Sequence, residues 1–182
     1  MATDFFDALH QVVESKLVLQ PDPQNLLLLA EEHNQGEGTL GESVWLKKRG
    51  KIFAFSLDQK GLDVFPFFKN TTGGIKKKND AILFCQDGTD CFVFIIELKS
   101  GNPGDGVIQL KAGRNFVDYL LRTIDLHFNK QFECQYRHII FHTRKSAQKG
   151  TFRRAKREPS TVGELQVYFE KCNQTYSIDE FF

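Results

Sequence analysis

The stretch of sequence that decides the fold spans residues 80–99 and reads DAILFCQDGTDCFVFIIELK. Its centre, residues 87–90, consists of Asp, Gly, Thr and Asp, which favour a tight turn. The flanking segments, residues 80–86 and 91–99, are predominantly apolar and include aromatic and β-branched residues typical of strands. We therefore predict a β-hairpin, and the wholly apolar run Phe92–Ile96 indicates that its second strand is buried on both faces.

The open end of this hairpin carries charged side chains. A turn centred between Gly88 and Thr89 places Asp80 directly opposite Glu97, with Cβ atoms roughly 4.5–5.5 Å apart. Two carboxylates this close repel each other unless a cation neutralises them, and hard Mg²⁺ prefers carboxylate oxygens. Lys99 follows Glu97 by two residues and projects from the same face of the strand. The sequence thus predicts two carboxylates and one ammonium group that converge at one strand end.

The alternative interpretation is a solvated surface hairpin. In it, Glu97 and Lys99 form an ordinary ion pair on one face, worth under about 1 kcal/mol. The apolar run directly before Glu97 argues against this interpretation, because a buried central strand rarely leads into two charged residues that have no functional role.

The segments before the hairpin mix helical and extended patterns. Apolar residues recur at nearly helical spacing over residues 4–17, and Asn25 is a candidate cap for a second helix over Leu26–Glu32. We also predict a short helix over Glu42–Lys48. Two strands joined by a turn at residues 58–61 are then expected: Lys51–Leu57 and Leu62–Phe68.

The segments after the hairpin predict a long helix and further strands. From Val107 the apolar residues follow an amphipathic helical pattern for about 20 residues. Strands are expected over Tyr136–His142 and Leu165–Phe169, the second being the last of the chain. The order of these elements predicts a mixed α/β domain rather than a doubly wound parallel sheet, and 182 residues suit a single domain.

Composition and charge exclude several classes of protein. The chain has 24 Lys and Arg residues and 23 Asp and Glu residues. This balance excludes a protein that coats nucleic acid with a uniformly basic surface, but it allows a local basic patch. No apolar run approaches the ~20 residues of a membrane span, and the first residues do not form a signal peptide. The four cysteines lack the spacing of a zinc site. We expect a cytoplasmic protein with free thiols and no membrane association.

Asp80, the hairpin and the triplet Glu97-Leu98-Lys99 resemble the active-site signature of the PD-(D/E)XK nuclease superfamily. The apolar strand that leads into the triplet and the helix that follows it are also typical of that family. The resemblance covers about residues 51–143 and departs from the motif at Asn79, where the family has Pro. It implies a restriction-endonuclease-like α/β fold, a mixed central β-sheet flanked by helices. Residues 1–182 would form one domain, with an N-terminal helical part (1–50), a catalytic core (51–143), and a basic loop and terminal strand (144–182).

This resemblance implies a metal-dependent nuclease that hydrolyses phosphodiester bonds with Mg²⁺-activated water, Mn²⁺ being a possible substitute. Asp80 and Glu97 would hold one or two metal ions, with help from the main-chain carbonyl of Leu98. Lys99 would orient or help deprotonate the attacking water and stabilise charge in the transition state. Many members add a Glu from an N-terminal helix. Glu42 is the candidate here, with three competitors: Glu14, Glu31 and Glu32.

A basic segment supplies the candidate substrate contacts. Residues 144–157 contain seven Lys or Arg and no acidic residue, which suits a phosphate-binding rim, although a solvated loop is the alternative. With the polar residue that many family members carry near the helix start, the candidate nucleic-acid-binding residues are Gln109, Lys111, Arg144, Lys145, Arg153, Arg154 and Arg157. We expect DNA rather than RNA as the substrate, with control by homodimerisation or a regulatory protein. The competing function is a non-catalytic nucleic-acid-binding or protein-interaction module on the same fold.

Overall fold

The computed structural model describes residues 4–30, 42–143 and 157–182. The helices in these ranges are α1 (Phe5–Val12) and α2 (Val107–Phe128), with short 3-10 turns η1 (Ser15–Leu17), η2 (Pro103–Gly106) and η3 (Ile178–Phe181). The strands are β1 (Val18–Leu19), β2 (Leu26–Ala30), β3 (Ser43–Lys47), β4 (Lys51–Phe55), β5 (Ala81–Asp87), β6 (Asp90–Lys99), β7 (Gln135–His142), β8 (Ser160–Val162), β9 (Leu165–Lys171) and β10 (Gln174–Ser177).

The larger sheet has the strand order β1-β4-β5-β6-β7-β9-β8 and is mixed. Strands β4, β5 and β6 are antiparallel, whereas β6, β7 and β9 are parallel. A parallel neighbour requires a crossover connection, and α2 supplies it between β6 and β7. The predicted mixed α/β class is therefore confirmed.

The hairpin has the predicted register. Asp87 pairs with Asp90 next to the turn, and Ala81 pairs with Ile96 at the other end. Strand β6 lies at the centre of the sheet, and its residues from Phe92 to Leu98 are buried. Because side chains alternate along a strand, Ile96 and Leu98 face one layer while Ile95 and Glu97 face the other.

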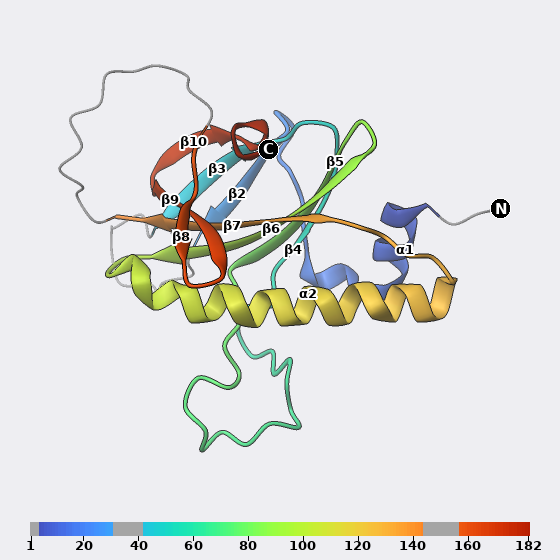
Figure 1. Cartoon of the computed structure of the whole chain (residues 1–182), viewed down its shortest axis with the longest axis horizontal. Coiled ribbons are helices and arrows are strands. Elements are labelled where there is room, and N and C mark those ends of the chain that lie inside the picture. The colour runs from blue at the N-terminus through green and yellow to red at the C-terminus, as the bar shows by residue number, and fades with distance from the viewer. Residues whose placement is uncertain (1–3, 31–41, 144–156) are drawn as a thin grey trace.

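The two faces of the larger sheet are covered differently (Figure 1). Helices α1 and α2 pack on one face, through residues such as Leu9, Leu110 and Val117. The other face is covered by a three-stranded sheet of order β10-β3-β2, through residues such as Leu27 and Val44. The expectation of a sheet flanked by helices thus holds for one face only. No helix in the described ranges is long and apolar enough to span a membrane.

The prediction of a helical part over residues 1–50 is wrong after α1. Leu26–Ala30 forms strand β2 instead of a helix, and Ser43–Lys47 forms β3. In β2, Leu27 and Leu29 are buried whereas Leu28 is 43% exposed, which is the two-residue period of a strand. A run of four leucines has no period of its own, so pairing with β3 decides its conformation.

The predicted strand over Leu62–Phe68 is also wrong. Strand β4 pairs directly with β5, and residues 56–80 between them form a long loop. Pro66 lacks a backbone N–H and suits this loop better than the interior of a sheet. Strand β9 is not the last strand either, because β10 follows it and joins the smaller sheet.

Helix α2 lies unusually close to β6. A Cβ atom at Gly113 would lie 1.9 Å from Oδ1 of Asn79 and 2.7 Å from Cγ2 of Ile95, so no larger residue fits there. At Gly106, directly before the helix, a Cβ atom would lie 3.2 Å from Cγ of Glu97. This close packing brings the first turn of α2 over the open end of the hairpin.

Candidate active site

Asp80 closes the open end of the hairpin. Its Oδ2 accepts a hydrogen bond of 2.6 Å from the backbone N–H of Leu98 on β6. Continuing the register of Ala81 with Ile96 by one residue sets Asp80 opposite Glu97, as predicted. The two carboxylates therefore lie on adjacent strands at one end of the sheet.

Glu97 is a buried acid with only part of its carboxylate bonded. Its side chain is 1% exposed and faces the helix layer. Oε1 contacts Nζ of Lys99 at 2.5 Å and also accepts a hydrogen bond from Nε2 of Gln109. Oε2 is buried and has no hydrogen-bond partner among the described residues. A buried carboxylate oxygen with no donor is costly, so its position marks a place where a positive group would bind favourably.

The electrostatics of the pair follow from burial and mutual repulsion. Burial, together with the charge of Asp80, raises the pKa of Glu97 to about 8. Burial also raises the pKa of Asp80 to about 6, against the stabilising hydrogen bond from Leu98. The positive charge of Lys99, whose ammonium group contacts Glu97, lowers the pKa of both groups. A single ammonium group thus favours the charged form of both acids.

Asp58 is a further acid near the pair, which the sequence analysis assigned only to a turn. Its negative charge raises the pKa of both Asp80 and Glu97, and its carboxylate forms a salt bridge of 3.1 Å with Lys78. Asp58 and Asp80 line a cleft of about 1030 Å³ together with residues from β2 and the 56–80 loop. Only the pairing of β4 with β5 brings Asp58 here, and the sequence did not predict that pairing.

The other predicted site residues are placed as follows. Gln109 reaches the site from the first turn of α2, and its Nε2 also donates to the carbonyl of Lys78 at 3.2 Å. Lys111 instead forms a salt bridge of 3.2 Å with Glu164 in the β8–β9 turn. Glu42 directly precedes strand β3 and does not lie on a helix, which corrects the expected setting of that candidate ligand. Among the described residues, no three acidic, His or Cys side chains form a group that could hold a metal ion.

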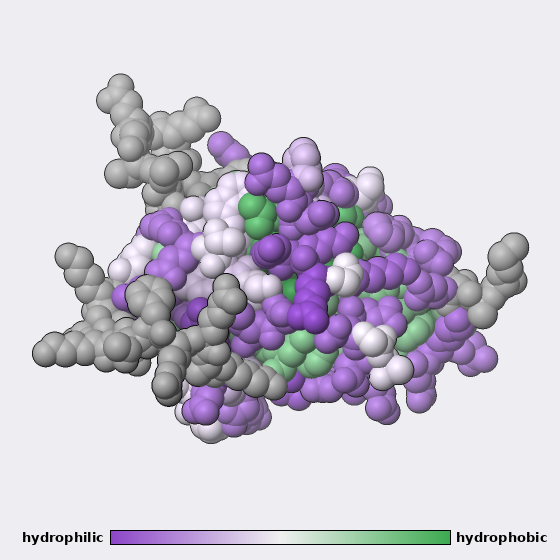
Figure 2. Space-filling view, turned by 90° about the horizontal axis from the view of Figure 1, so that it is seen from above, coloured by the Kyte–Doolittle hydropathy of each residue, from purple (hydrophilic) through white to green (hydrophobic). Residues whose placement is uncertain are grey.

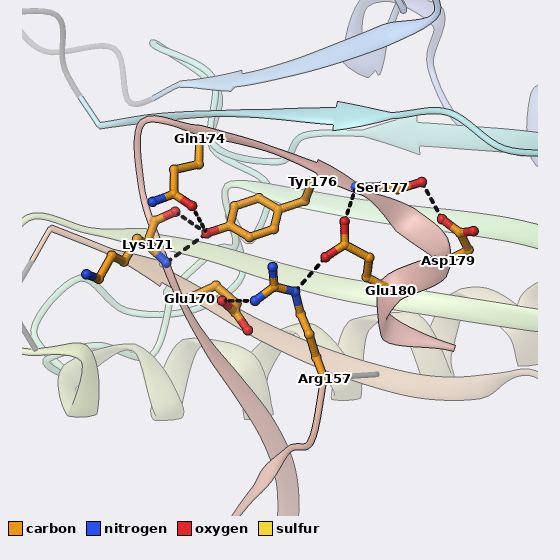
Figure 3. Close-up of polar contacts among 8 residues, drawn as sticks. All are labelled: Arg157, Glu170, Lys171, Gln174, Tyr176, Ser177, Asp179 and Glu180. Atoms are coloured by element: carbon orange, nitrogen blue, oxygen red, sulfur yellow. Dashed lines mark hydrogen bonds and ion pairs between the residues drawn. The ribbon is translucent and has the colours of Figure 1, made fainter. Parts of the chain in front are cut away.

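Most of the basic segment falls outside the ranges that the structure describes. Arg144, Lys145, Arg153 and Arg154 lie outside the described residues, as do Glu31 and Glu32. Arg157 is described, and it packs within the C-terminal part of the chain (Figure 3). Its guanidinium group donates to Glu170 at 2.5 Å and to Glu180 at 2.8 Å, and lies 4.7 Å from the ring centroid of Tyr176. These contacts give Arg157 a structural role, and its contact with nucleic acid stays a prediction.

Replacing Arg157 by alanine should lower the free energy of unfolding by about 1–3 kcal/mol, because two carboxylates lose a charged donor. Urea denaturation measures this loss. Arg157→Lys should recover little of it, since an ammonium group cannot bind both carboxylates in the same planar arrangement. A variant Arg157→Ala of unchanged stability but weakened DNA binding would show instead that Arg157 acts mainly as a substrate contact.

The pKa values predict how stability depends on pH without metal. The pKa of Glu97 is about 8 in the folded state against a reference value of 4.5. Between these two pH values the folded state therefore binds one proton more than the unfolded state. The contribution of Glu97 to the free energy of unfolding should therefore fall as pH rises from about 5 to 8.5, by about 1.4 kcal/mol per pH unit at most. Urea denaturation in EDTA should show this fall in the wild type and a flatter profile in Glu97→Gln. Parallel profiles for the two proteins would contradict the shift.

Comparison of the chain with family models, curated proteins and solved structures finds no match. The buried carboxylate of Glu97, with one oxygen lacking a donor among the described residues, and the half-buried carboxylate of Asp80 form a group that attracts a hard cation. An ammonium group beside them adds a proton donor and a positive charge at the same place.

Proposed function

We propose that the chain is a metal-dependent nuclease that hydrolyses phosphodiester bonds, in DNA rather than RNA, with a restriction-endonuclease-like fold of the PD-(D/E)XK superfamily. The observation that carries the proposal is the buried carboxylate of Glu97, whose Oε2 has no donor among the described residues, next to Asp80 and Lys99. The helix that follows the triplet and contributes Gln109 supports it further.

The residues present suit Mg²⁺ or Mn²⁺. Mg²⁺ commonly keeps several waters and is bound by only one or two carboxylates, which Asp80 and Glu97 provide. The carbonyl of Leu98 is a third candidate oxygen. In a strand the N–H and C=O of one residue point to the same side. Because the N–H of Leu98 points to Asp80, its carbonyl also faces the side of the strand on which Asp80 lies. A bound ion would polarise the scissile phosphate and lower the pKa of a water.

The protein side chains would then act as follows. Lys99 places its ammonium group within contact of Glu97 and near Asp80, where it can orient the attacking water and stabilise the charge that develops on the phosphate oxygens. Gln109 bonds Oε1 of Glu97 and the carbonyl of Lys78. Gln109 would therefore act as a positioning residue for Glu97. The resemblance alone led us to expect that it contacts the nucleic acid.

A non-catalytic binding module on the same fold is the second candidate. The observation in its favour is the ion pair between Lys99 and Glu97, which can neutralise the buried acid without a metal. That module would bind nucleic acid or a protein equally well in EDTA. Control of the nuclease by a second copy or a regulatory protein stays a prediction.

The test of the proposed function is a cleavage assay with the full chain. Plasmid, linear duplex, single-stranded DNA and RNA are incubated with Mg²⁺, with Mn²⁺ and with EDTA. The nuclease proposal predicts products from at least one DNA substrate with either metal and none in EDTA. Cleavage that persists in EDTA, or intact substrates under all conditions, would reject it.

A further inference from the structure

The loop over residues 56–80, which joins β4 to β5, projects from the body of the protein on the helix side (Figure 1). Both ends of the loop belong to the candidate site, since Asp58 lies at its start and Asp80 at its end. The salt bridge between Lys78 and Asp58 joins these ends. The loop is therefore tied to the candidate site at both of its ends.

The loop exposes two neighbouring aromatic rings. Phe67 is 74% exposed and Phe68 is 36% exposed, with ring centroids 4.4 Å apart. Phe65 fixes this pair to the body of the protein, because it contacts both rings and also packs edge-on against Phe116 of α2 at 6.3 Å. By contrast, the surface seen from above in Figure 2 is mostly hydrophilic. Two exposed rings on an anchored support suggest a surface built for stacking.

The same loop also carries several lysine residues. Lys60, Lys69 and Lys77 have no carboxylate within salt-bridge distance in the parts of the chain that the structure describes. Lys76 pairs with Asp63 at 2.8 Å and so helps to hold the loop. Lysines that lack acidic partners attract phosphates, and exposed aromatic rings stack on bases. The combination is typical of surfaces that bind single-stranded nucleic acid.

We propose that the 56–80 loop binds unpaired nucleotides next to the cleavage site, with Phe67 and Phe68 stacking on exposed bases and the lysines contacting the backbone. The inference rests on the proposed nuclease function and names its substrate class: a single strand, or a duplex with unpaired bases beside the cut. An intact duplex hides the faces of its bases, so it offers these rings nothing to stack on except its ends.

The test measures binding without cleavage. Full-length Glu97→Gln protein in EDTA is titrated against a fluorescently labelled single-stranded DNA and a blunt duplex of the same length, with fluorescence anisotropy as the readout. The additional change Phe67→Ala with Phe68→Ala should weaken single-strand binding roughly tenfold to a hundredfold and duplex binding much less. The matched control is Tyr119→Ala with Leu126→Ala, exposed residues on α2, and should leave both affinities unchanged.

A second variant gives a direct readout of stacking. Phe67→Trp should keep the single-strand affinity, and its fluorescence should be quenched when DNA binds. Unchanged affinity in the double alanine variant, equal losses in the control, or unquenched tryptophan would overturn the proposal. So would binding of the loop to anionic phosphatidylserine vesicles in place of DNA. This test measures no cleavage. If the wild-type protein proved inactive, the nuclease proposal would be rejected, and the binding result could still be interpreted.

Discussion

Replacing Glu97 by alanine should abolish Mg²⁺-dependent DNA cleavage, with a loss of at least ~10³ in rate. Asp80→Ala should do the same. Asp80 directly precedes β5 and bonds the backbone of β6 beside Glu97, which has a buried oxygen without a donor among the described residues, so each loss removes half of the proposed metal site. Rates are measured on a DNA substrate at saturating enzyme and Mg²⁺.

The control for these variants is Asp87→Ala. Asp87 is an exposed acid of the same hairpin, at the turn end, far along the strand from the site. This variant should cleave at the wild-type rate. Both site variants should stay folded, since each removes an acid whose charged form burial disfavours when no metal is bound. Near-normal cleavage by either site variant would show that the metal site is wrongly placed.

Replacing Lys99 by alanine should slow the chemical step by ~10²–10³ and weaken metal binding much less. The ammonium group is held against Glu97 at 2.5 Å and is 20% exposed, so in the proposed nuclease it would lie beside the place where charge develops in the transition state. The ammonium group should therefore stabilise the transition state more than the ground state. Single-turnover cleavage and calorimetric metal binding, measured on the same variant, separate the two effects.

Two results would change the role of Lys99. An equal fall in metal affinity and in rate would mean that it only organises the carboxylates. A rate within threefold of the wild type would remove it from the mechanism, together with the main reason for preferring this nuclease family. Lys111→Ala is the matched control, because Lys111 is a lysine that pairs with Glu164 outside the site.

The hairpin and the long helix could be predicted from the sequence because their signals are local. A turn of Asp, Gly, Thr and Asp between two apolar runs fixes the register, and this register alone sets Asp80 beside Glu97. Helix α2 follows from regular amphipathic spacing. Gln109 was identified by the resemblance, although the structure gives it a contact with Glu97 that spacing cannot show.

The remaining features depend on pairing between distant segments. Leu26–Ala30 becomes a strand only because β3 lies beside it, and β3 is also paired with β10 from the other end of the chain. Asp58 joins the candidate site only because β4 pairs with β5 across the 56–80 loop. A run of leucines or a single acid in a turn carries no local signal for either outcome.

The proposal depends on whether Asp80 and Glu97 hold a divalent ion, and a calorimetric titration of Mn²⁺ into the full chain tests this most directly. The wild type should bind one or two ions and release protons at pH 7, because the pKa of Glu97 is about 8 and its carboxylate must lose its proton to bind. Glu97→Gln should lose this binding. No binding by the wild type, or the same isotherm in both proteins, would contradict the metal site.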